Sequence, residues 1–151
     1  MSKGELVYLD TSVISAYFDT RSEARMAETL KFFDNLSIAT LSISDLVTRE
    51  LELISDARLR HNILKFVAPF RVFQVNEEAE SLAEEYVEES IVPSRYFNDA
   101  LHIAIAIINN VNVLVSWNFE HLVRRKTKVR VNYVNSLKGY KPIDIVSPLD
   151  F

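Results

Sequence analysis

The sequence has no cysteine and very little glycine or proline, with only 2 Gly and 4 Pro among 151 residues. The lack of cysteine excludes a disulfide framework, a thiol nucleophile and a zinc site built on thiolates. The scarcity of Gly and Pro, and the absence of any low-complexity run, argue against a disordered chain. Apolar residues make up 48% of the sequence, which is enough for one sizeable core. We therefore expect a single folded domain over residues 1–151.

Long hydrophobic runs are missing as well. The longest apolar stretches, at residues 100–108 and 111–117, are separated by Asn109 and Asn110 and are too short to span a bilayer. Residues 1–5 lead straight into a strand-like segment and lack the architecture of a signal peptide. We expect a soluble cytoplasmic protein without membrane association.

The formal net charge is −4, whereas a tight, non-specific nucleic-acid binder is usually basic. Acidity does not count against an enzyme whose carboxylates bind a metal ion, because the ion reverses the local charge. The charge therefore excludes neither nuclease chemistry nor a nucleic-acid substrate.

Short apolar segments alternate with helical patterns along the chain. The sequence predicts strands over residues 6–9, 38–43, 71–75, 112–116 and 143–146. It predicts helices over residues 11–18, 22–34, 45–54, 56–67, 76–89 and 97–108, another that starts at 118, and a short one near 131–137. This alternation predicts an α/β fold in which helices cover both faces of a parallel sheet.

Glu50 lies on the helix face that should turn inward. Val47, Glu50, Leu51 and Ile54 follow the i, i+3, i+4, i+7 spacing of one face. A carboxylate on such a face is costly unless it is paired or bound to metal. A buried ion pair, or a place at the rim open to water, would explain Glu50 equally well.

Asp10, Asp99 and Asn118 each lie where a strand ends or a helix begins. Each could simply cap a helix. Taken together with Glu50, however, they should meet at the carboxyl ends of parallel strands, where α/β proteins bind ligands. Carboxylates brought together repel one another, and a divalent cation bound by oxygen ligands and water relieves that cost.

Four segments in this order resemble the PIN-domain pattern, and in particular the VapC-like toxins and related bacterial and archaeal PIN proteins. The segments are Leu9-Asp10-Thr11-Ser12, Thr48-Arg49-Glu50-Leu51, Asn98-Asp99-Ala100-Leu101-His102-Ile103-Ala104 and Leu114-Val115-Ser116-Trp117-Asn118-Phe119. The resemblance covers essentially the whole chain.

The resemblance implies a three-layer α/β/α fold and cleavage of RNA that depends on Mg²⁺ or Mn²⁺. It implies Asp10, Glu50, Asp99 and Asn118 as the catalytic and metal-binding residues, and Ser116 as the hydroxyl residue that precedes the fourth position. For many members it also implies homodimerisation and a partner antitoxin, so the chain would be the toxin of a type II toxin-antitoxin pair. Asn118 departs from the family, in which many members have a fourth acid.

The alternative function is a non-catalytic PIN-like module that binds RNA or a protein partner, and Asn118 is the feature that favours it. Rival enzyme classes fit poorly, because a haloacid-dehalogenase-like phosphatase would need a second acid at the place of Ser12. A phosphate-cradling glycine loop is absent. A receiver domain would need an acid pair near the first strand, which the sequence lacks.

Several other residues are explained by packing or solvent exposure without a role in catalysis. We expect His102 to be a packed, hydrogen-bonded helix histidine, although it could orient Asp99. We expect His61 and His121 to face solvent. Trp117 and Phe119 could stack a base, but we expect both to pack in the core. The basic cluster is equally consistent with an RNA phosphate contact and with a solvated loop. Its members are Arg124, Arg125, Lys126, Lys128 and Arg130.

Overall fold

The computed structural model describes residues 4–151, and in it five parallel strands form one sheet. The strands are β1 (Val7–Leu9), β2 (Leu41–Ser44), β3 (Arg71–Phe73), β4 (Val113–Val115) and β5 (Asp144–Val146). Their order across the sheet is β3-β2-β1-β4-β5, so β1 is the central strand. The predicted parallel sheet is confirmed. The expectation for residues 1–3 lies outside the described residues.

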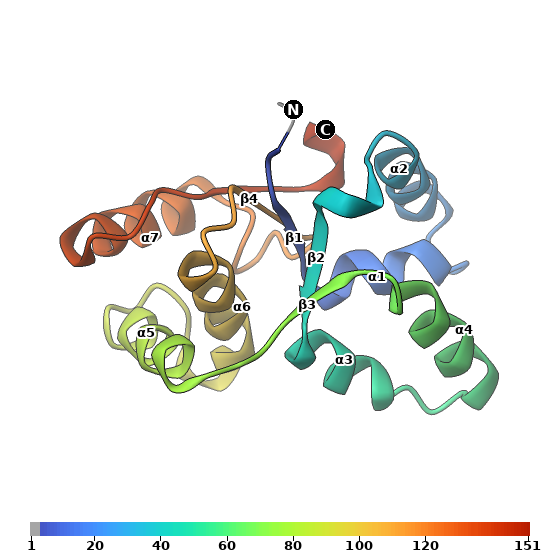
Figure 1. The fold of residues 1–151 in the computed structure, drawn as a ribbon, viewed down its shortest axis with the longest axis horizontal. Helices are drawn as coiled ribbons and strands as arrows, with labels where there is room; N and C mark the ends of the chain where they lie inside the picture. The colour runs from blue at the N-terminus through green and yellow to red at the C-terminus, as the bar shows by residue number, and fades with distance from the viewer. Residues whose placement is uncertain (1–3) are drawn as a thin grey trace.

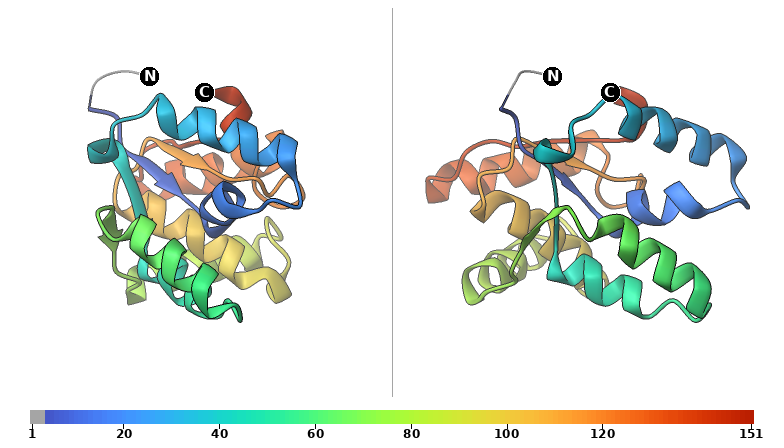
Figure 2. Two further views of the ribbon diagram at one scale, coloured as in Figure 1. Left: turned by 90° about the vertical axis from the view of Figure 1, so that its right-hand side faces the viewer. Right: turned by 45° about the vertical axis from the view of Figure 1, so that its right-hand side comes forward.

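Helices cover both faces of this sheet, which confirms the three-layer α/β/α architecture. They are α1 (Thr11–Phe18), α2 (Glu23–Asp34), α3 (Asp45–Glu52), α4 (Ala57–Val67), α5 (Glu77–Glu88), α6 (Phe97–Ile108) and α7 (Arg125–Lys138). Figure 1 shows α5, α6 and α7 on one side of the strands and α1, α2 and α4 on the other. The left panel of Figure 2 has α2 and α4 in front, with the other group behind the strands. None of the helices in the described part of the chain combines the length and apolar composition needed to cross a bilayer.

Strand-end side chains start the helices next to the sheet. Asp10, directly after β1, accepts a hydrogen bond from the Val13 amide and caps α1. Ser44, the last residue of β2, caps α3 through the Val47 amide. Such caps stabilise a helix by about 1 kcal/mol each. They also turn the chain sharply, so polar side chains are left at the carboxyl edge of the central strands.

Helix α6 is the most deeply buried helix. Every residue from Ala100 to Ile107 is buried, as the apolar composition predicts. One of its neighbours is α5, whose buried stripe is Ala79, Leu82, Ala83 and Tyr86. Burying apolar surface is the dominant favourable term in folding. Asp99, in the first turn of α6, is therefore carried by one of the most firmly packed elements of the molecule.

Three predicted elements differ clearly from the structure. Residues 38–40 form a 3-10 turn, so β2 begins only at Leu41. No helix starts at Asn118. The amides of Leu122 and Val123 both donate to the Asn118 carbonyl oxygen, and this closes a turn instead of propagating a helix. Helix α7 begins later, at Arg125.

The late start of α7 changes the setting of the basic cluster. The predicted short helix at 131–137 is the second half of α7. The cluster therefore does not form a loop. Arg125, Lys126, Lys128 and Arg130 lie in the first two turns of α7, and Arg124 is its N-cap.

Tyr86 provides a test of the packing between α5 and α7. Its hydroxyl donates to Asn135 Oδ1 over 2.5 Å in the core, where Asn135 Nδ2 already has no partner among the described residues. Tyr86→Phe would leave the Asn135 oxygen unpaired as well. We expect a loss of about 1–3 kcal/mol in the free energy of unfolding, measured by urea denaturation. Tyr133→Phe, at a position with 66% exposure, is the control and should change little. Equal stability of the two variants would contradict this account.

Candidate active site

Asp10, Asp99 and Asn118 belong to one hydrogen-bond network at the carboxyl edge of the sheet. Ser116 Oγ donates to Asp10 Oδ2 over 2.5 Å and accepts from the Asn118 amide over 2.9 Å. Asn118 Nδ2 in turn donates to Asp99 Oδ2 over 3.2 Å. The network therefore connects the ends of β1 and β4 with the first turn of α6.

Glu50 joins the network through the residue after Asp10. Thr11 Oγ1 donates to Glu50 Oε1 over 2.7 Å, which places the α3 carboxylate beside the start of α1. Glu50 therefore lies on the same edge of the sheet as Asp10. The structure brings all four predicted site residues into one connected region.

Asp10 is held out of water, with only 5% of the residue exposed. Ser12 Oγ donates to its Oδ1 over 2.6 Å, and Ser116 donates to its Oδ2. Burial raises the pKa of Asp10, and the opposing effects of His102, Ser116 and Ser12 do not fully cancel that shift. The ionised carboxylate is thus only partly compensated by its surroundings.

Glu50 is more accessible to solvent, with 30% of its side chain exposed. Partial burial pushes the pKa of Glu50 up, but the hydrogen bonds from His102 and Thr11 lower it by more, so the pKa lies below its usual value. Glu50 is therefore held as a carboxylate. Its inward position is explained by these partners.

A chain of buried groups holds the His102 ring. Ser44 Oγ lies 2.7 Å from the Tyr8 hydroxyl, and that hydroxyl lies 2.7 Å from His102 Nδ1. Burial raises the pKa of Tyr8 well above its usual value, so its hydroxyl keeps its proton. On the other side of the ring, Nε2 lies 2.9 Å from Glu50 Oε1. His102 is packed and hydrogen-bonded as expected, but the acid it contacts is Glu50 and not Asp99.

Asp99 has a histidine of its own. His121 Nδ1 lies 3.0 Å from Asp99 Oδ2, and His121 is only 7% exposed. The expectation that His121 faces solvent is therefore wrong. The Tyr96 ring packs over the His121 ring, with 4.2 Å between the ring centres. The sequence does not predict this contact, because its pattern after β4 indicates a helix where the structure has a turn.

The side chain of Asn118 is oriented by the backbone of the same turn. Its Oδ1 accepts a hydrogen bond from the His121 amide over 2.9 Å. A backbone N–H can only donate, so the oxygen must face that amide and the NH₂ group faces Asp99. In this arrangement Asn118 offers Asp99 a donor where a fourth acid would offer a further negative oxygen.

The donor chemistry fits a hard divalent cation. Asp10, Glu50 and Asp99 supply carboxylate oxygens, which Mg²⁺ prefers, often together with water. Asp10, which is buried and only partly compensated, is the group that a cation would stabilise most. Across residues 4–151, no cluster of three or more acidic or histidine side chains is arranged to hold a metal ion. The assignment of Asp10, Glu50, Asp99 and Asn118 as metal ligands stays a prediction.

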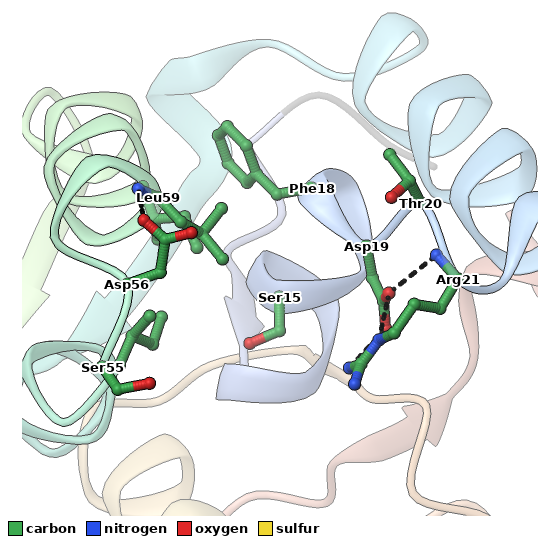
Figure 3. A pocket seen from close by; sticks show the side chains of 10 residues that line it. Ser15, Phe18, Asp19, Thr20, Arg21, Ser55, Asp56 and Leu59 are labelled. Carbon is green, nitrogen blue, oxygen red and sulfur yellow. Dashed lines mark hydrogen bonds and ion pairs between the residues drawn. The ribbon is translucent and has the colours of Figure 1, made fainter.

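Two hollows bear on what could approach this region. One, of about 610 Å³, is lined in part by Glu50 and Asn98, the neighbour of Asp99. The other, of about 510 Å³, is the groove in Figure 3 between the end of α1 and the start of α4. Its lining includes Phe18 and Leu59 but none of the four predicted site residues. The first hollow therefore borders Glu50, and the groove is a separate surface.

The amino-acid sequence matches the family model of the PIN domain over residues 7–121, a segment that contains all four predicted site residues. The chain belongs to the PIN-domain family. No curated protein sequence matches it significantly.

Solved PIN structures have the same fold. The chain is similar to VapC20 of Mycobacterium tuberculosis, described as a toxin that cleaves the sarcin-ricin loop, with 16% identity and a TM-score of 0.63 over 91% of this chain and 98% of that one. It is similar to FitAcB of Neisseria gonorrhoeae, with 12% identity and a TM-score of 0.66 over 97% and 100%. It is also similar to a chain of a toxin-antitoxin complex from Klebsiella pneumoniae, with 13% identity and a TM-score of 0.61 over 76% and 88%. At these identities the likeness establishes the fold alone.

A pair of substitutions at Asp10 separates its capping role from its charge. Asp10→Asn keeps an oxygen for the Val13 amide and removes a buried charge, so we expect stability equal to or above that of the natural chain in EDTA. Asp10→Ala removes the cap and should be about 0.5–2 kcal/mol less stable than Asp10→Asn. Urea unfolding of both variants measures this difference. A strongly destabilised Asp10→Asn would show that the carboxylate itself is structural.

Proposed function

We propose that this PIN-domain protein is an endoribonuclease that depends on Mg²⁺ or Mn²⁺. The observation that carries the proposal is the hydrogen-bonded network that joins Asp10, Asp99 and Asn118 and, through Thr11, Glu50 at the carboxyl edge of the sheet. Nucleases of the PIN family generally use divalent metal ions. The partly compensated charge of Asp10 supplies a physical reason for a cation at this place.

In this proposal Asp10, Glu50 and Asp99 hold the ion. When bound, such an ion would supply the chemistry for in-line attack of water on a phosphodiester with cleavage of the bond to the 3′-oxygen, and it would stabilise the charge that develops on the phosphoryl oxygens. Thr11 and His102 orient Glu50, while Asn118 and His121 orient Asp99. Direct ligation through Asn118 Oδ1 would require this oxygen to give up its hydrogen bond with the His121 backbone amide. Ligation through a water molecule is therefore the simpler arrangement.

RNA contacts are proposed from the surface next to Asp99. Phe119 is 48% exposed and can stack an unpaired base, whereas Trp117 is buried and donates through Nε1 to Thr29. Arg125 and Lys126 are exposed at the start of α7. Thr127 Oγ1 donates to the His121 carbonyl oxygen over 2.8 Å, so this basic turn packs directly on the turn that carries His121. Phosphate groups near the site would meet these cations.

A partner antitoxin and a homodimer belong to the same proposal. The Klebsiella pneumoniae neighbour is part of a toxin-antitoxin complex. In this chain the lining of the groove in Figure 3 includes the apolar residues Phe18, Leu59 and Ile63 beside polar ones, and the apolar part suits an apolar segment of such a partner. Helix α7 also presents Val129, Tyr133 and Leu137 as an exposed apolar stripe, which is the feature that fits a second copy.

A non-catalytic PIN-like module is the second candidate, and Asn118 favours it. The Asn118 amide already provides one oxygen of Asp99 with a hydrogen-bond donor, so Asp99 depends less on a cation. Manganese titration separates the two candidates, because a catalytic site should bind Mn²⁺ whereas a decayed one should not.

Cleavage of single-stranded RNA is the direct test of the enzyme. The protein with Mn²⁺ or Mg²⁺ should leave a 5′-phosphate, because the expected nucleophile is water and not the ribose 2′-hydroxyl. EDTA and Asp10→Asn should each abolish cutting, and the surface control Asp34→Asn should not. Activity that survives EDTA, or 2′,3′-cyclic phosphate products, would reject this mechanism. If no RNA is cut and Mn²⁺ does not bind in calorimetry, the non-catalytic module is favoured.

Asn118→Asp tests the fourth position. Without metal, a carboxylate in place of the Asn118 amide would face Asp99, so we expect a lower melting temperature in EDTA than for the natural chain. With metal, the added charge should increase the stabilisation by Mn²⁺ and keep or raise RNA cleavage. Asn118→Ser is the neutral control, since serine can also cap a helical turn. Equal stabilisation of Asn118→Asp and Asn118→Ser by Mn²⁺ would contradict the assignment.

A further inference from the structure

Glu50 and Asp99 are held in the same way by different elements. Glu50 Oε1 accepts from Thr11 Oγ1 over 2.7 Å and from His102 Nε2 over 2.9 Å. Asp99 Oδ2 accepts from Asn118 Nδ2 over 3.2 Å and from His121 Nδ1 over 3.0 Å. In each carboxylate one oxygen takes both hydrogen bonds. The second oxygens, Glu50 Oε2 and Asp99 Oδ1, accept none from any residue in the range 4–151.

Both histidines are fixed by contacts of their own. His102 is 3% exposed, and its Nδ1 is 2.7 Å from the Tyr8 hydroxyl. His121 is 7% exposed; the Tyr96 ring covers it, and its backbone amide is bonded to Asn118. The His102 ring cannot turn away from Glu50 without losing its contact with Tyr8, and the His121 ring cannot turn away from Asp99 without disturbing its packing against Tyr96. The histidines are thus rigid supports that solvent scarcely reaches.

We propose that His102 and His121 are positioning residues of the metal site, each of which binds one oxygen of an acid and so reserves the other oxygen for the ion. This inference rests on the proposed function. A carboxylate held by a rigid donor loses less side-chain freedom when it binds a metal ion. Groups that hydrogen-bond to metal ligands in this way affect metal affinity by about 10-fold to 100-fold. The two imidazoles support acids on different elements, one on α3 and one on α6.

The two histidines use different ring nitrogens, and this permits a crossed experiment. His102 contacts Glu50 through Nε2, the atom whose place a glutamine amide nitrogen can take. His121 contacts Asp99 through Nδ1, the atom whose place an asparagine amide nitrogen can take. The four variants are His102→Gln, His102→Asn, His121→Asn and His121→Gln. A role in packing alone would not favour opposite amides at the two positions.

Calorimetric titration of the chain with Mn²⁺ alone is the test, with melting temperatures in EDTA recorded for each variant. We expect His102→Gln and His121→Asn to keep affinities within about 3-fold of the natural chain. His102→Asn and His121→Gln should bind Mn²⁺ about 10-fold to 100-fold more weakly. If the His102 variants fail to melt cooperatively, the His121 pair decides, because His121 lies on a turn at the edge of the core.

The inference is overturned if the Gln and Asn variants of either histidine bind Mn²⁺ with equal affinity, or with the opposite order of affinity, provided that both variants fold. The proposed nuclease would remain intact in that case. No Mn²⁺ binding by the natural chain would overturn both. A difference in affinity that merely follows the melting temperature in EDTA would also overturn the inference, since it would reveal a structural role. The two proposals therefore fail in distinguishable ways.

Discussion

The burial of one carboxylate at the end of the central strand is the constraint on which the site depends. Asp10 follows β1, the middle strand of the sheet, where the flanking strands and helices exclude water. A charge in such a place is unfavourable unless its surroundings compensate for it. The hydroxyl groups of Ser12 and Ser116 converge on it for this reason, and Ser116 in turn fixes the turn after β4 through the Asn118 amide. Ser116 therefore links Asp10 to the Asn118 backbone, and the Asn118 side chain in turn contacts Asp99.

The three acids are compensated unequally. Glu50 and Asp99 each lie against an imidazole within 3.0 Å, whereas in the described chain the side-chain donors to Asp10 are both hydroxyl groups. Hydrogen bonds to a carboxylate favour its ionised form, but the nearby His102 and the two hydroxyl groups do not offset the burial of Asp10, as its raised pKa indicates. The network therefore combines two supported acids with an acid whose charge its surroundings compensate only in part. A cation bound among these acids would stabilise Asp10 most, because the protein itself compensates the charge of Asp10 least.

Much of this arrangement could be predicted from local sequence patterns. The caps at Asp10 and Ser44, and the apolar run of α6, depend on neighbouring residues and are visible without a structure. The inward position of Glu50 followed from helical spacing alone. The role of His121 did not, because its contact with Asp99 joins residues 22 positions apart through a turn whose composition resembles the start of a helix. The orientation of the Asn118 amide could not be predicted either, because it is fixed by a hydrogen bond from the backbone of the same turn.

The central claim is that the protein binds a divalent ion through Asp10 and through the oxygens of Glu50 and Asp99 that accept no hydrogen bond within the described residues. Anomalous diffraction from crystals soaked in Mn²⁺ tests this most directly, because it locates the ion and its ligand atoms together. The account predicts manganese in contact with Asp10 and with Glu50 Oε2 or Asp99 Oδ1, while both imidazoles keep their hydrogen bonds to the opposite oxygens. Manganese bound to Glu50 Oε1 or Asp99 Oδ2 with the imidazoles displaced, or no manganese at this edge of the sheet, would contradict it.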